Sequence, residues 1–518
     1  MGKTFYVTTP IYYVNDVPHI GHAYTTIIAD TIARFKKLMG YEVFFLTGTD
    51  EHGQKVEKAA RSQGMEPKEL ADKVVERFKA LWKKLNIKYD YFIRTTEKNH
   101  EEGVKKIFSF LMKKGDIYKG GYSGWYCISD ESFLPESAEF SSNGKKICPD
   151  CGRESEIVSE ECYFFRLSKY RDKLLKFYEE NPEFIQPSSR RNEVISFVKA
   201  GLKDLSVTRA TVRWGIPVPG DPSQTIYVWF DALINYLTGI GYGWDGEKFN
   251  KFWPADIHLI GKDILRFHAI YWPAFLIAAE IPLPKTVFGH GWWLKDETKM
   301  SKSKGNVLDP YTLLNAFGSD SIRYFLLREI PIGLDGNFSH EGLINRINSD
   351  LANDLGNLLN RILVMAKKYF HSVIDTIGEE NNLDSSLRRS FEKTKKLVTE
   401  EFEKYSISKG LEVIWEFIYE INKYLDQARP WSLSEKEKKS GRLGRILFQG
   451  LESIRLITPF LFPVMSGSAE KIWNVFFPET NIENLNLTEI EWKERKSLKV
   501  QEPFQLFPRI DSKEFFSE

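Results

Sequence analysis

Cysteine is scarce in this sequence: the 518 residues contain only four, and three of them lie between Cys127 and Cys151. Such a cluster is not the framework of a disulfide-stapled secreted protein, so a reducing compartment is expected. No segment approaches the roughly 18 to 20 apolar residues that a membrane helix needs, and no membrane partner is expected. The chain runs directly into an apolar segment at Phe5, which leaves no room for a targeting leader unless one has been removed.

An excess of charge of either sign is also missing. Lysine and arginine number 72 against 71 aspartates and glutamates, giving a net charge of +1. A nucleic-acid partner would therefore have to be bound by a local basic face, because the global charge gives no indication of one. Apolar residues make up 42% of the chain, which is enough for large cores and argues against disorder. A chain of this length is expected to form roughly two to four domains.

The beginning of the chain has the pattern of a strand, a helix and a second strand. Residues 5–8 are expected to form a short buried strand, and a helical pattern opens at Gly21 and stops at Gly40. Residues 41–46 then form a second buried strand that ends in a loop at 47–50. This order predicts a βαβ unit in a doubly wound parallel sheet, with its ligand at the carboxyl ends of the strands.

The rest of the chain departs from this pattern twice. Residues 118–165 are rich in glycine, serine and glutamate and carry the cysteine cluster, which indicates an insertion. Strands and helices resume at 226–230 and 257–261. From about residue 343 to the end, apolar residues recur at steps of three or four, which predicts amphipathic helices without strands. The predicted fold is therefore an α/β Rossmann-like domain with a small insertion, followed by an all-α bundle.

The segment Pro18-His19-Ile20-Gly21-His22 lies between the first strand and its helix. Histidines three residues apart at a helix start lie on one face, and glycine lets a ligand approach the backbone. The positive end of the helix also suits phosphate. Two ordinary core or capping histidines are the alternative, and this motif alone does not separate the two interpretations.

A second motif, Lys299-Met300-Ser301-Lys302-Ser303, is followed by Lys304-Gly305-Asn306. Its three lysines lie among small residues, as in a mobile cationic loop that neutralises charge developing on a triphosphate. A solvated basic loop is the alternative for a lysine run on its own. The two motifs together, in this order and far apart in the sequence, resemble the HIGH and KMSKS signatures of class I aminoacyl-tRNA synthetases.

Four further segments resemble the methionyl-tRNA synthetases among this class, and the resemblance runs from residue 5 to about residue 465. The segments are Thr9–Asn15, Phe45–Gly53, Tyr227–Ala232 and Ile260–His268. The resemblance implies that methionine and ATP form methionyl-adenylate and pyrophosphate, and that methionine is then esterified to the 3′ end of initiator and elongator methionine tRNA. The insertion is too short for the editing domain of relatives that use valine, isoleucine or leucine, which favours methionine.

The resemblance also implies the role of each site residue. His19, His22 and Lys302 would stabilise the adenylation transition state, with Lys299 supporting the loop. ATP, assisted by Mg²⁺, would be bound by His19, Gly21, His22, Gly261, Asp263 and Lys302. Asp50 would bind the ammonium group of methionine.

The methionine pocket would be completed by Ile11, Tyr13, Trp229, Ala232, Leu233, Tyr236, Ile264 and His268. Aromatic faces around a small residue suit a flexible, polarizable thioether. Its sulfur is a weak hydrogen-bond acceptor, to which Tyr13 or His268 could donate. Leu233 departs from family members that carry proline there, which should reshape the pocket wall only slightly. Ordinary core packing is the alternative for Trp229 and Tyr236 taken alone.

The cysteine cluster resembles the zinc knuckle of the same family. Cys127 and Asp130 form one half and Cys148 and Cys151 the other, so three thiolates and one carboxylate could close a tetrahedral site. The segment around Asp130 also resembles members that have lost the metal, and there the aspartate would be structural. Bound Zn²⁺ and a metal-free knuckle therefore both stay open. Cys162 lies outside the pattern and is expected to be a packed thiol.

In the helical region, Asn357, Arg361 and Trp431 match the family's anticodon readers, which hydrogen-bond and stack on splayed-out bases. Without the resemblance, a polar helix face and a tryptophan packed on the bundle would be the simpler interpretations. The chain ends soon after the bundle and lacks the dimerisation module of some relatives, so a monomer is expected. A cytoplasmic location is expected, with the mitochondrial matrix as the alternative if a leader has been removed.

The expected domain boundaries follow from these patterns. The catalytic domain covers residues 1–117 and 166–285, interrupted by the knuckle-bearing insertion at 118–165. Residues 286–342 carry the KMSKS loop and a region that contacts the tRNA stem, and residues 343–518 form the anticodon-binding domain. Two other functions fit the sequence less well: a small-molecule nucleotidylyltransferase, which needs no such bundle, and a non-catalytic tRNA-binding relative, which would be expected to lose the histidines or Lys302.

Overall fold

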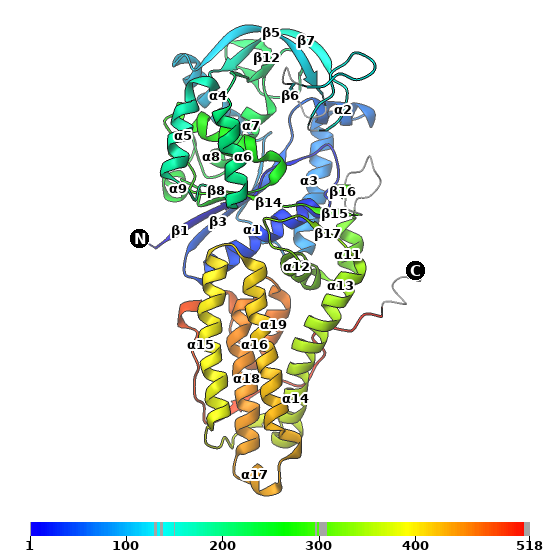
Figure 1. Ribbon diagram of the computed structural model, residues 1–518, viewed down its shortest axis with the longest axis vertical. Coiled ribbons are helices and arrows are strands. Elements are labelled where there is room, and N and C mark those ends of the chain that lie inside the picture. Colours follow the sequence, from blue (N-terminus) through cyan, green and yellow to red (C-terminus); the bar gives the residue numbers. More distant parts are fainter. Residues whose placement is uncertain are drawn as a thin grey trace.

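A twisted parallel sheet forms the centre of the first half of the chain in the computed structural model (Figure 1). The structure describes residues 2–128, 132–134, 138–149, 151–295, 298–299 and 308–511. The strand order is β2-β3-β1-β13-β14-β8, with β4 also paired to β3, and every pair is parallel. The strands are β1 (Thr4–Thr8), β2 (Tyr12–Tyr13), β3 (Glu42–Asp50), β4 (Tyr91–Arg94), β8 (Ile185–Gln186), β13 (Ile257–Gly261) and β14 (Val287–His290).

The order in which strands are added to this sheet reverses between β1 and β13. From β1 the chain passes through helix α1 (Ile20–Leu38) to β3 on one side, whereas β13 and β14 extend the sheet on the other. Ligands of open α/β sheets bind outside the carboxyl ends of the strands at such a switch point. The remaining helices of this half are α2 (Gln54–Ser62), α3 (Pro67–Lys84), α4 (Lys98–Lys113), α5 (Arg171–Glu180), α6 (Ser188–Lys199), α7 (Val228–Leu233), α8 (Asn235–Thr238), α9 (Gly246–Phe252) and α10 (Trp272–Ala278).

Antiparallel strands lie at the end of the molecule opposite the bundle (Figure 1). Strands β5 (Ile117–Cys127) and β7 (Glu156–Phe165) pair along most of their length and form a long ribbon. Strands β6 (Ser132–Phe133) and β9 (Leu205–Ser206) flank the ribbon. A second small sheet consists of β10 (Thr208–Arg209), β11 (Pro217–Val218) and β12 (Asp221–Ile226).

The second half of the chain is helical. Its helices are α11 (Pro310–Phe317), α12 (Ser319–Arg328), α13 (His340–Arg346), α14 (Asn357–Phe370), α15 (Asn382–Glu403), α16 (Ile407–Ala428), α17 (Glu435–Lys439), α18 (Arg442–Leu461) and α19 (Ser466–Phe476), with a π-helical stretch between α13 and α14. Three short strands, β15 (Trp293–Lys295), β16 (Thr298–Lys299) and β17 (Gly336–Asn337), connect the halves. No described helix combines the length and apolarity needed to cross a membrane.

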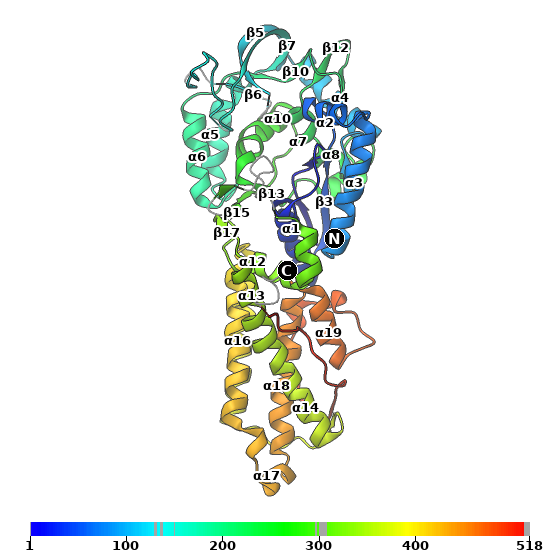
Figure 2. The ribbon, with the colours of Figure 1, turned by 90° about the vertical axis from the view of Figure 1, so that its right-hand side faces the viewer.

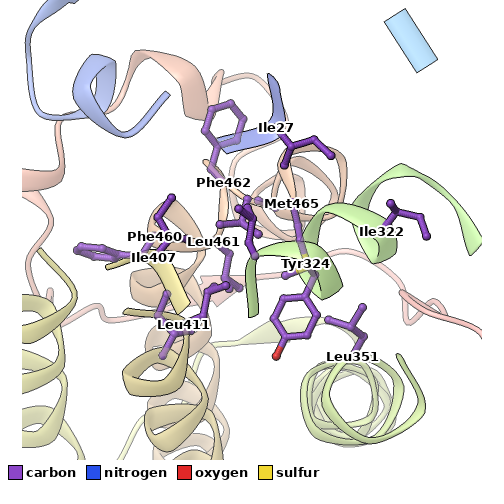
Figure 3. Close-up of a cluster of buried hydrophobic side chains, with 14 of the residues drawn as sticks. Ile27, Ile322, Tyr324, Leu351, Ile407, Leu411, Phe460, Leu461, Phe462 and Met465 are labelled. Atoms are coloured by element: carbon purple, nitrogen blue, oxygen red, sulfur yellow. The ribbon is translucent and has the colours of Figure 1, made fainter. Parts of the chain in front are cut away.

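One hydrophobic core continues from α1 into the helical bundle. Figure 2 shows α1 and α12 at the junction of the two halves. Figure 3 shows Ile27 of α1 in one cluster with Ile322 of α12, Leu411 of α16 and Met465, all of which are buried. Because α1 also packs on the sheet, the helix that starts in the HIGH motif is held by both halves of the molecule.

The main differences between the observed elements and the sequence prediction lie at three places. β3 extends to Asp50, so residues 47–50 are strand and not loop, because β4 and β2 pair with them. Residues 228–230 belong to helix α7 and not to a strand, since β12 ends at Ile226. A short apolar run fits a buried strand and a buried helix equally well. The last region contains one two-stranded sheet, β18 (Val373–Ile374) with β19 (Leu498–Lys499), where none was expected.

Candidate active site

His19 and His22 form a stacked pair at the start of α1. The helix begins at Ile20, one residue before the predicted Gly21, with His19 as its N-cap. The two imidazole centroids are 3.7 Å apart. His19 Nδ1 accepts from the Gly21 amide at 3.0 Å, and His22 Nδ1 accepts from the His19 amide at 3.3 Å. In the neutral form each ring therefore carries its proton on Nε2.

Gly21 is required for this arrangement. A Cβ at residue 21 would lie 2.9 Å from His19 Cε1, so any side chain would displace the ring that caps the helix. The histidine pair lies after β1, at the sheet's switch point. Two N–H donors and the positive end of a helix of 19 residues thus occur together at a place suited to phosphate.

Gly261 and Asp263 follow the neighbouring strand β13. A Cβ at Gly261 would lie 2.6 Å from Asp263 Oδ1, so glycine is needed here for this carboxylate to lie close to the end of β13. Asp263 Oδ1 accepts from the Trp292 indole N–H at 3.2 Å. Lys262 lies over the Trp292 ring at 4.2 Å and forms an ion pair with Asp335. The end of β13 is thereby joined to the segment that leads into the KMSKS motif.

Lys299 lies in β16, which pairs with β15 just beyond Trp292. Lys302 lies outside the described residues, as does the rest of the KMSKS motif after Lys299.

Asp50 ends β3 and is buried, and Tyr13 is its backbone partner on β2. The loop after Asp50 is firmly held through Glu51, whose carboxylate accepts from Arg94 Nε at 2.6 Å and from Arg94 Nη2 at 3.0 Å. Ile11 is half-buried and packs on the same hydrophobic cluster as Trp229, Leu233, Tyr236 and Ile264. These expected pocket residues therefore share one large core cluster of the α/β half.

Trp229 stacks on Phe267 with their ring centroids 3.7 Å apart, and it meets His268 edge-on at 6.4 Å. The neighbouring Ala232 and Leu233 are buried on the same short helix. The Tyr236 hydroxyl lies 2.7 Å from His268 Nε2, and His268 Nδ1 lies 3.0 Å from the Ile264 carbonyl oxygen.

These contacts fix the protonation of His268. Its Nδ1–H donates to the carbonyl of Ile264, so its Nε2 accepts from the Tyr236 hydroxyl. Burial lowers the pKa of His268 to about 4, which keeps the ring neutral near pH 7. In this arrangement both ring nitrogens of His268 are engaged within the protein.

The sulfur atoms of Cys127, Cys148 and Cys151 all lie within 4.8 Å of one another, and those of Cys127 and Cys151 are 3.5 Å apart. Cys127 and Cys148 are buried and Cys151 is half-buried. Asp130, the fourth expected ligand, lies outside the described residues. Cys162 is buried away from this group beside Ser206, whose hydroxyl lies 3.2 Å from its sulfur.

The three expected anticodon readers lie on the helical bundle. Asn357 begins α14 and is exposed, and Arg361 lies one turn further along the same helix. The Arg361 guanidinium lies 5.4 Å from the Trp431 ring centroid, and Trp431 is 50% exposed. Arg361 also contacts Asp426 at 3.4 Å. Arg361 and Trp431 therefore form one surface feature, with Asn357 a helical turn away.

Sequence reasoning missed several buried polar groups next to α7. Asp231 accepts from both His52 and His100, and no motif connects these three positions. Arg209 lies between the rings of Tyr126 and Tyr227, at 5.1 Å and 4.3 Å from their centroids. The only available indication was that His52 and Asp231 fall inside two of the four segments that carry the family resemblance.

Comparison with known proteins agrees with this geometry. The family "tRNA synthetases class I (M)" matches residues 5–363, and the family "Anticodon-binding domain of tRNA ligase" matches residues 384–513. The second match continues past residue 465, so the likeness extends further than inspection of the sequence indicates.

Individual relatives are similar over nearly the whole chain. The methionine–tRNA ligase of Caldanaerobacter subterraneus subsp. tengcongensis is 54% identical, covering 99% of this chain and 80% of the relative. That of Thermotoga maritima is 49% identical, covering 99% and 81%. The structure of Mycobacterium tuberculosis methionyl-tRNA synthetase in complex with methionyl-adenylate is 44% identical with a TM-score of 0.94, covering 98% of this chain and 100% of that chain. The chain therefore belongs to the methionyl-tRNA synthetase family, the class I aminoacyl-tRNA synthetases that join methionine to its tRNA.

Proposed function

We propose that this chain forms methionyl-adenylate from methionine and ATP and then transfers methionine to tRNA, with the residue roles given below. In the first step a carboxylate oxygen of methionine attacks the α-phosphorus of ATP, and pyrophosphate leaves. In the second step a hydroxyl of the terminal ribose of tRNA attacks the adenylate carbonyl carbon, and AMP leaves. The observation that carries the proposal is the stacked His19–His22 pair at the start of α1.

The two histidines would act as hydrogen-bond donors to the phosphate oxygens. Each uses Nδ1 as an acceptor from the backbone, so the proton of each neutral ring lies on Nε2. Donors that are already oriented stabilise charge developing in a transition state without having to reorganise. Lys302 would add positive charge on the pyrophosphate side, and Lys299 would anchor the loop through β16.

Gly261 and Asp263 would bind the nucleoside of ATP, since they lie at the end of β13 beside the histidine motif. Mg²⁺ would enter with ATP. His19 and His22 present donors and not acceptors, so the phosphates and water would supply its ligands, as this ion prefers. Bound in this way, Mg²⁺ would offset phosphate charge.

Asp50 would bind the ammonium group of methionine, and Ile11 would line the pocket near it. The side chain would lie among Tyr13, Trp229, Ala232, Leu233, Tyr236, Ile264 and His268. A fixed hydrogen bond between Tyr236 and His268 supports this assignment, because it makes a rigid apolar wall from two polar residues.

Zinc fits the cysteine cluster. In a tetrahedral site with Zn–S bonds near 2.3 Å, the sulfur atoms lie roughly 3.8 Å apart, which is compatible with the observed limits of 3.5 and 4.8 Å. Cys127, Cys148 and Cys151 would supply three thiolates, and Asp130 remains the proposed fourth ligand. The metal would hold the knuckle together. Zinc analysis of the purified protein, compared with a Cys148→Ser variant, tests this: about one zinc per chain is expected, lost in the variant.

Asn357, Arg361 and Trp431 would read the anticodon, the two side chains of the Arg361–Trp431 pair offering a stacking surface. We divide the chain accordingly into catalytic residues 1–117 and 166–285, an insertion at 118–165, a KMSKS and stem-contact region at 286–342, and an anticodon-binding domain at 343–518. A monomer would suffice, because one chain supplies every proposed group. The bacterial relatives favour bacterial cytoplasm.

Pyrophosphate exchange tests the proposal directly. Amino-acid-dependent exchange between ATP and labelled pyrophosphate is measured without tRNA for all twenty amino acids. Exchange with methionine alone is expected. Exchange with a different amino acid would overturn the pocket assignment, and no exchange from folded protein would favour a non-catalytic tRNA-binding relative.

A further inference from the structure

Three buried polar side chains meet at Asp231, on the helix that also carries Trp229 and Ala232 of the proposed methionine pocket. His52 follows β3, Asp231 lies in α7, and His100 lies in α4. His52 Nδ1 is 2.7 Å from Asp231 Oδ2, and His100 Nε2 is 2.7 Å from Asp231 Oδ1. Asp231 is fully buried, and the two histidines are 4% and 1% exposed. Each carboxylate oxygen of Asp231 thus has its own histidine partner.

These partners come from segments that carry the substrate-binding groups. His52 lies two residues after Asp50, and Asp231 lies between Trp229 and Ala232. Helix α7 has only six residues and no side-chain cap, so its own hydrogen bonds hold it weakly. The contact between Asp231 and His52 joins this short helix directly to the end of β3.

The remaining contacts complete a fixed network. His100 Nδ1 lies 2.8 Å from the Thr238 hydroxyl of α8, so its ring is held at both nitrogens. The His52 ring meets Trp214 edge-on at 5.5 Å, and the indole N–H of Trp214 donates to the Glu51 carbonyl at 2.5 Å. Four segments far apart in the sequence are therefore connected through one carboxylate.

The charged groups around this network shift the pKa values of His52 and Asp231. Burial alone would lower the pKa of His52. The negative charge of Asp231 has the larger opposite effect, and Glu101 and Glu51 add to it, so the pKa of His52 is raised. Burial likewise opposes charge on Asp231, but His52 and His100 lower its pKa. Glu51 is itself paired with Arg94, and Glu101 belongs to α4, the helix of His100.

We propose that His52, Asp231 and His100 form a positioning clamp that holds α7 against the end of β3 and so sets the width of the methionine pocket. The clamp rests on the proposed function, because its consequence is methionine recognition. Its members are positioning residues and not catalytic ones, since they act through Trp229, Ala232 and Asp50. Loss of the clamp affects the amino-acid side of the site and leaves the nucleotide side, after β1 and β13, in place.

Pyrophosphate exchange and methionine binding by calorimetry test the clamp. Asp231→Ala is expected to raise the KM and the Kd for methionine about 10- to 100-fold, as misplacement of pocket groups does, and to change the KM for ATP by less than about 3-fold. Asp116→Ala is the matched control, because Asp116 is also fully buried and paired, with Lys169, but belongs to the α4–β5 connection. It is expected to leave the KM for methionine unchanged.

Asp231→Asn keeps the test decisive if the alanine variant does not fold. Its amide can accept from His100 and donate to neutral His52, so near-normal methionine binding is expected at pH 8. Protonation of His52 removes that second contact. Without the Asp231 charge, burial lowers the pKa of His52, so the KM of this variant should rise only well below about pH 6.5, while that of the wild type does not.

Three results would overturn the clamp: an unchanged KM for methionine in Asp231→Ala, an equal rise in the KM for ATP, or a pH profile of Asp231→Asn that matches the wild type. Failure of the proposed function is separately visible, because it would appear as absent methionine-dependent exchange in the wild type, whereas methionine binding by calorimetry would still report on the clamp.

Discussion

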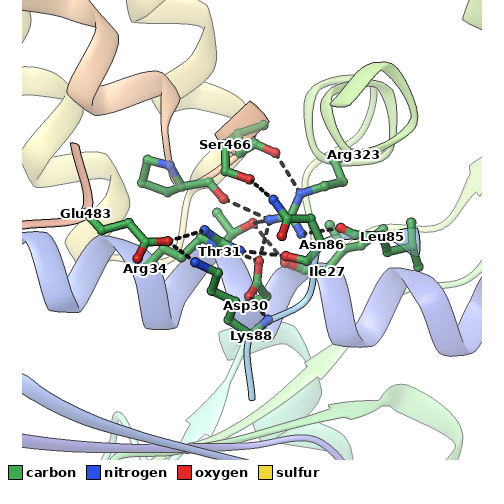
Figure 4. Close-up of polar contacts among 12 residues, drawn as sticks. Ile27, Asp30, Thr31, Arg34, Leu85, Asn86, Lys88, Arg323, Ser466 and Glu483 are labelled. Atoms are coloured by element: carbon green, nitrogen blue, oxygen red, sulfur yellow. Dashed lines mark hydrogen bonds and ion pairs between the residues drawn. The ribbon is translucent and has the colours of Figure 1, made fainter. Parts of the chain in front are cut away.

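Arg323 and Asp30 form a fully buried ion pair, with Nη2 and Oδ2 2.6 Å apart, at the point where the sheet domain meets the bundle. Arg323 lies in α12 and Asp30 in α1. Arg323 Nε also donates to the Val464 carbonyl at 2.8 Å, and Asp30 accepts from Arg34 Nε at 2.8 Å (Figure 4). One guanidinium thus links the HIGH-motif helix to the turn between α18 and α19.

Replacing Arg323 should therefore be costly. Arg323→Met removes one partner of a buried pair and leaves Asp30 with less compensation, so the free energy of unfolding should fall by about 3–5 kcal/mol. The control is Lys176→Met, which breaks the exposed Lys176–Glu180 pair and should cost at most about 1 kcal/mol. Chemical denaturation measures both. Equal effects would show that the buried pair contributes no more than a surface pair.

His268 should make stability depend on pH. Burial lowers its folded pKa to about 4, below the value of about 6.5 in an unfolded chain. Between these values the unfolded state binds more protons, so stability falls as the pH falls through this window, by roughly 3 kcal/mol in all.

His268→Gln isolates this effect, because it removes the titrating ring and leaves His258, whose pKa burial also lowers, in place. The advantage of the wild type over the variant should shrink between pH 7 and pH 4, as measured by denaturation at each pH. An advantage that grew on acidification would mean that folded His268 takes up a proton readily.

His19 should have two separable roles, as a helix cap and as a phosphate donor. His19→Ala loses both, so stability should fall by about 1 kcal/mol and the rate of adenylate formation by about 100- to 1000-fold. His19→Asn keeps a good cap that can accept from Gly21 but lacks the Nε2–H. It should therefore restore stability and not rate, as thermal melting and single-turnover adenylation would show. A wild-type rate in His19→Asn would reduce His19 to a cap.

The sequence predicted those parts of the site that lie in short continuous motifs. His19 and His22 are three residues apart, so their common position at a helix start follows from local geometry. The His52–Asp231–His100 network was not predicted, because its contacts span 179 and 131 residues and depend on how the sheet packs. Residues 228–230 were misassigned for a similar reason: an apolar run is compatible with strand or helix until its neighbours are placed.

Trp431 should affect tRNA charging and not adenylation. The side chain is 50% exposed and lies over Arg361, so Trp431→Ala should leave the fold and pyrophosphate exchange intact. A lost stacking contact of about 1–3 kcal/mol should lower kcat/KM for charging of methionine tRNA about 5- to 150-fold. Trp431→Phe keeps an aromatic face and should recover most of this loss.

Trp244→Ala, at a similarly exposed tryptophan of the α/β half, is the control and should change neither assay. If Trp431→Ala lost both activities equally, Trp431 would be supporting the bundle and not binding RNA, because loss of a contact to tRNA leaves adenylation unchanged.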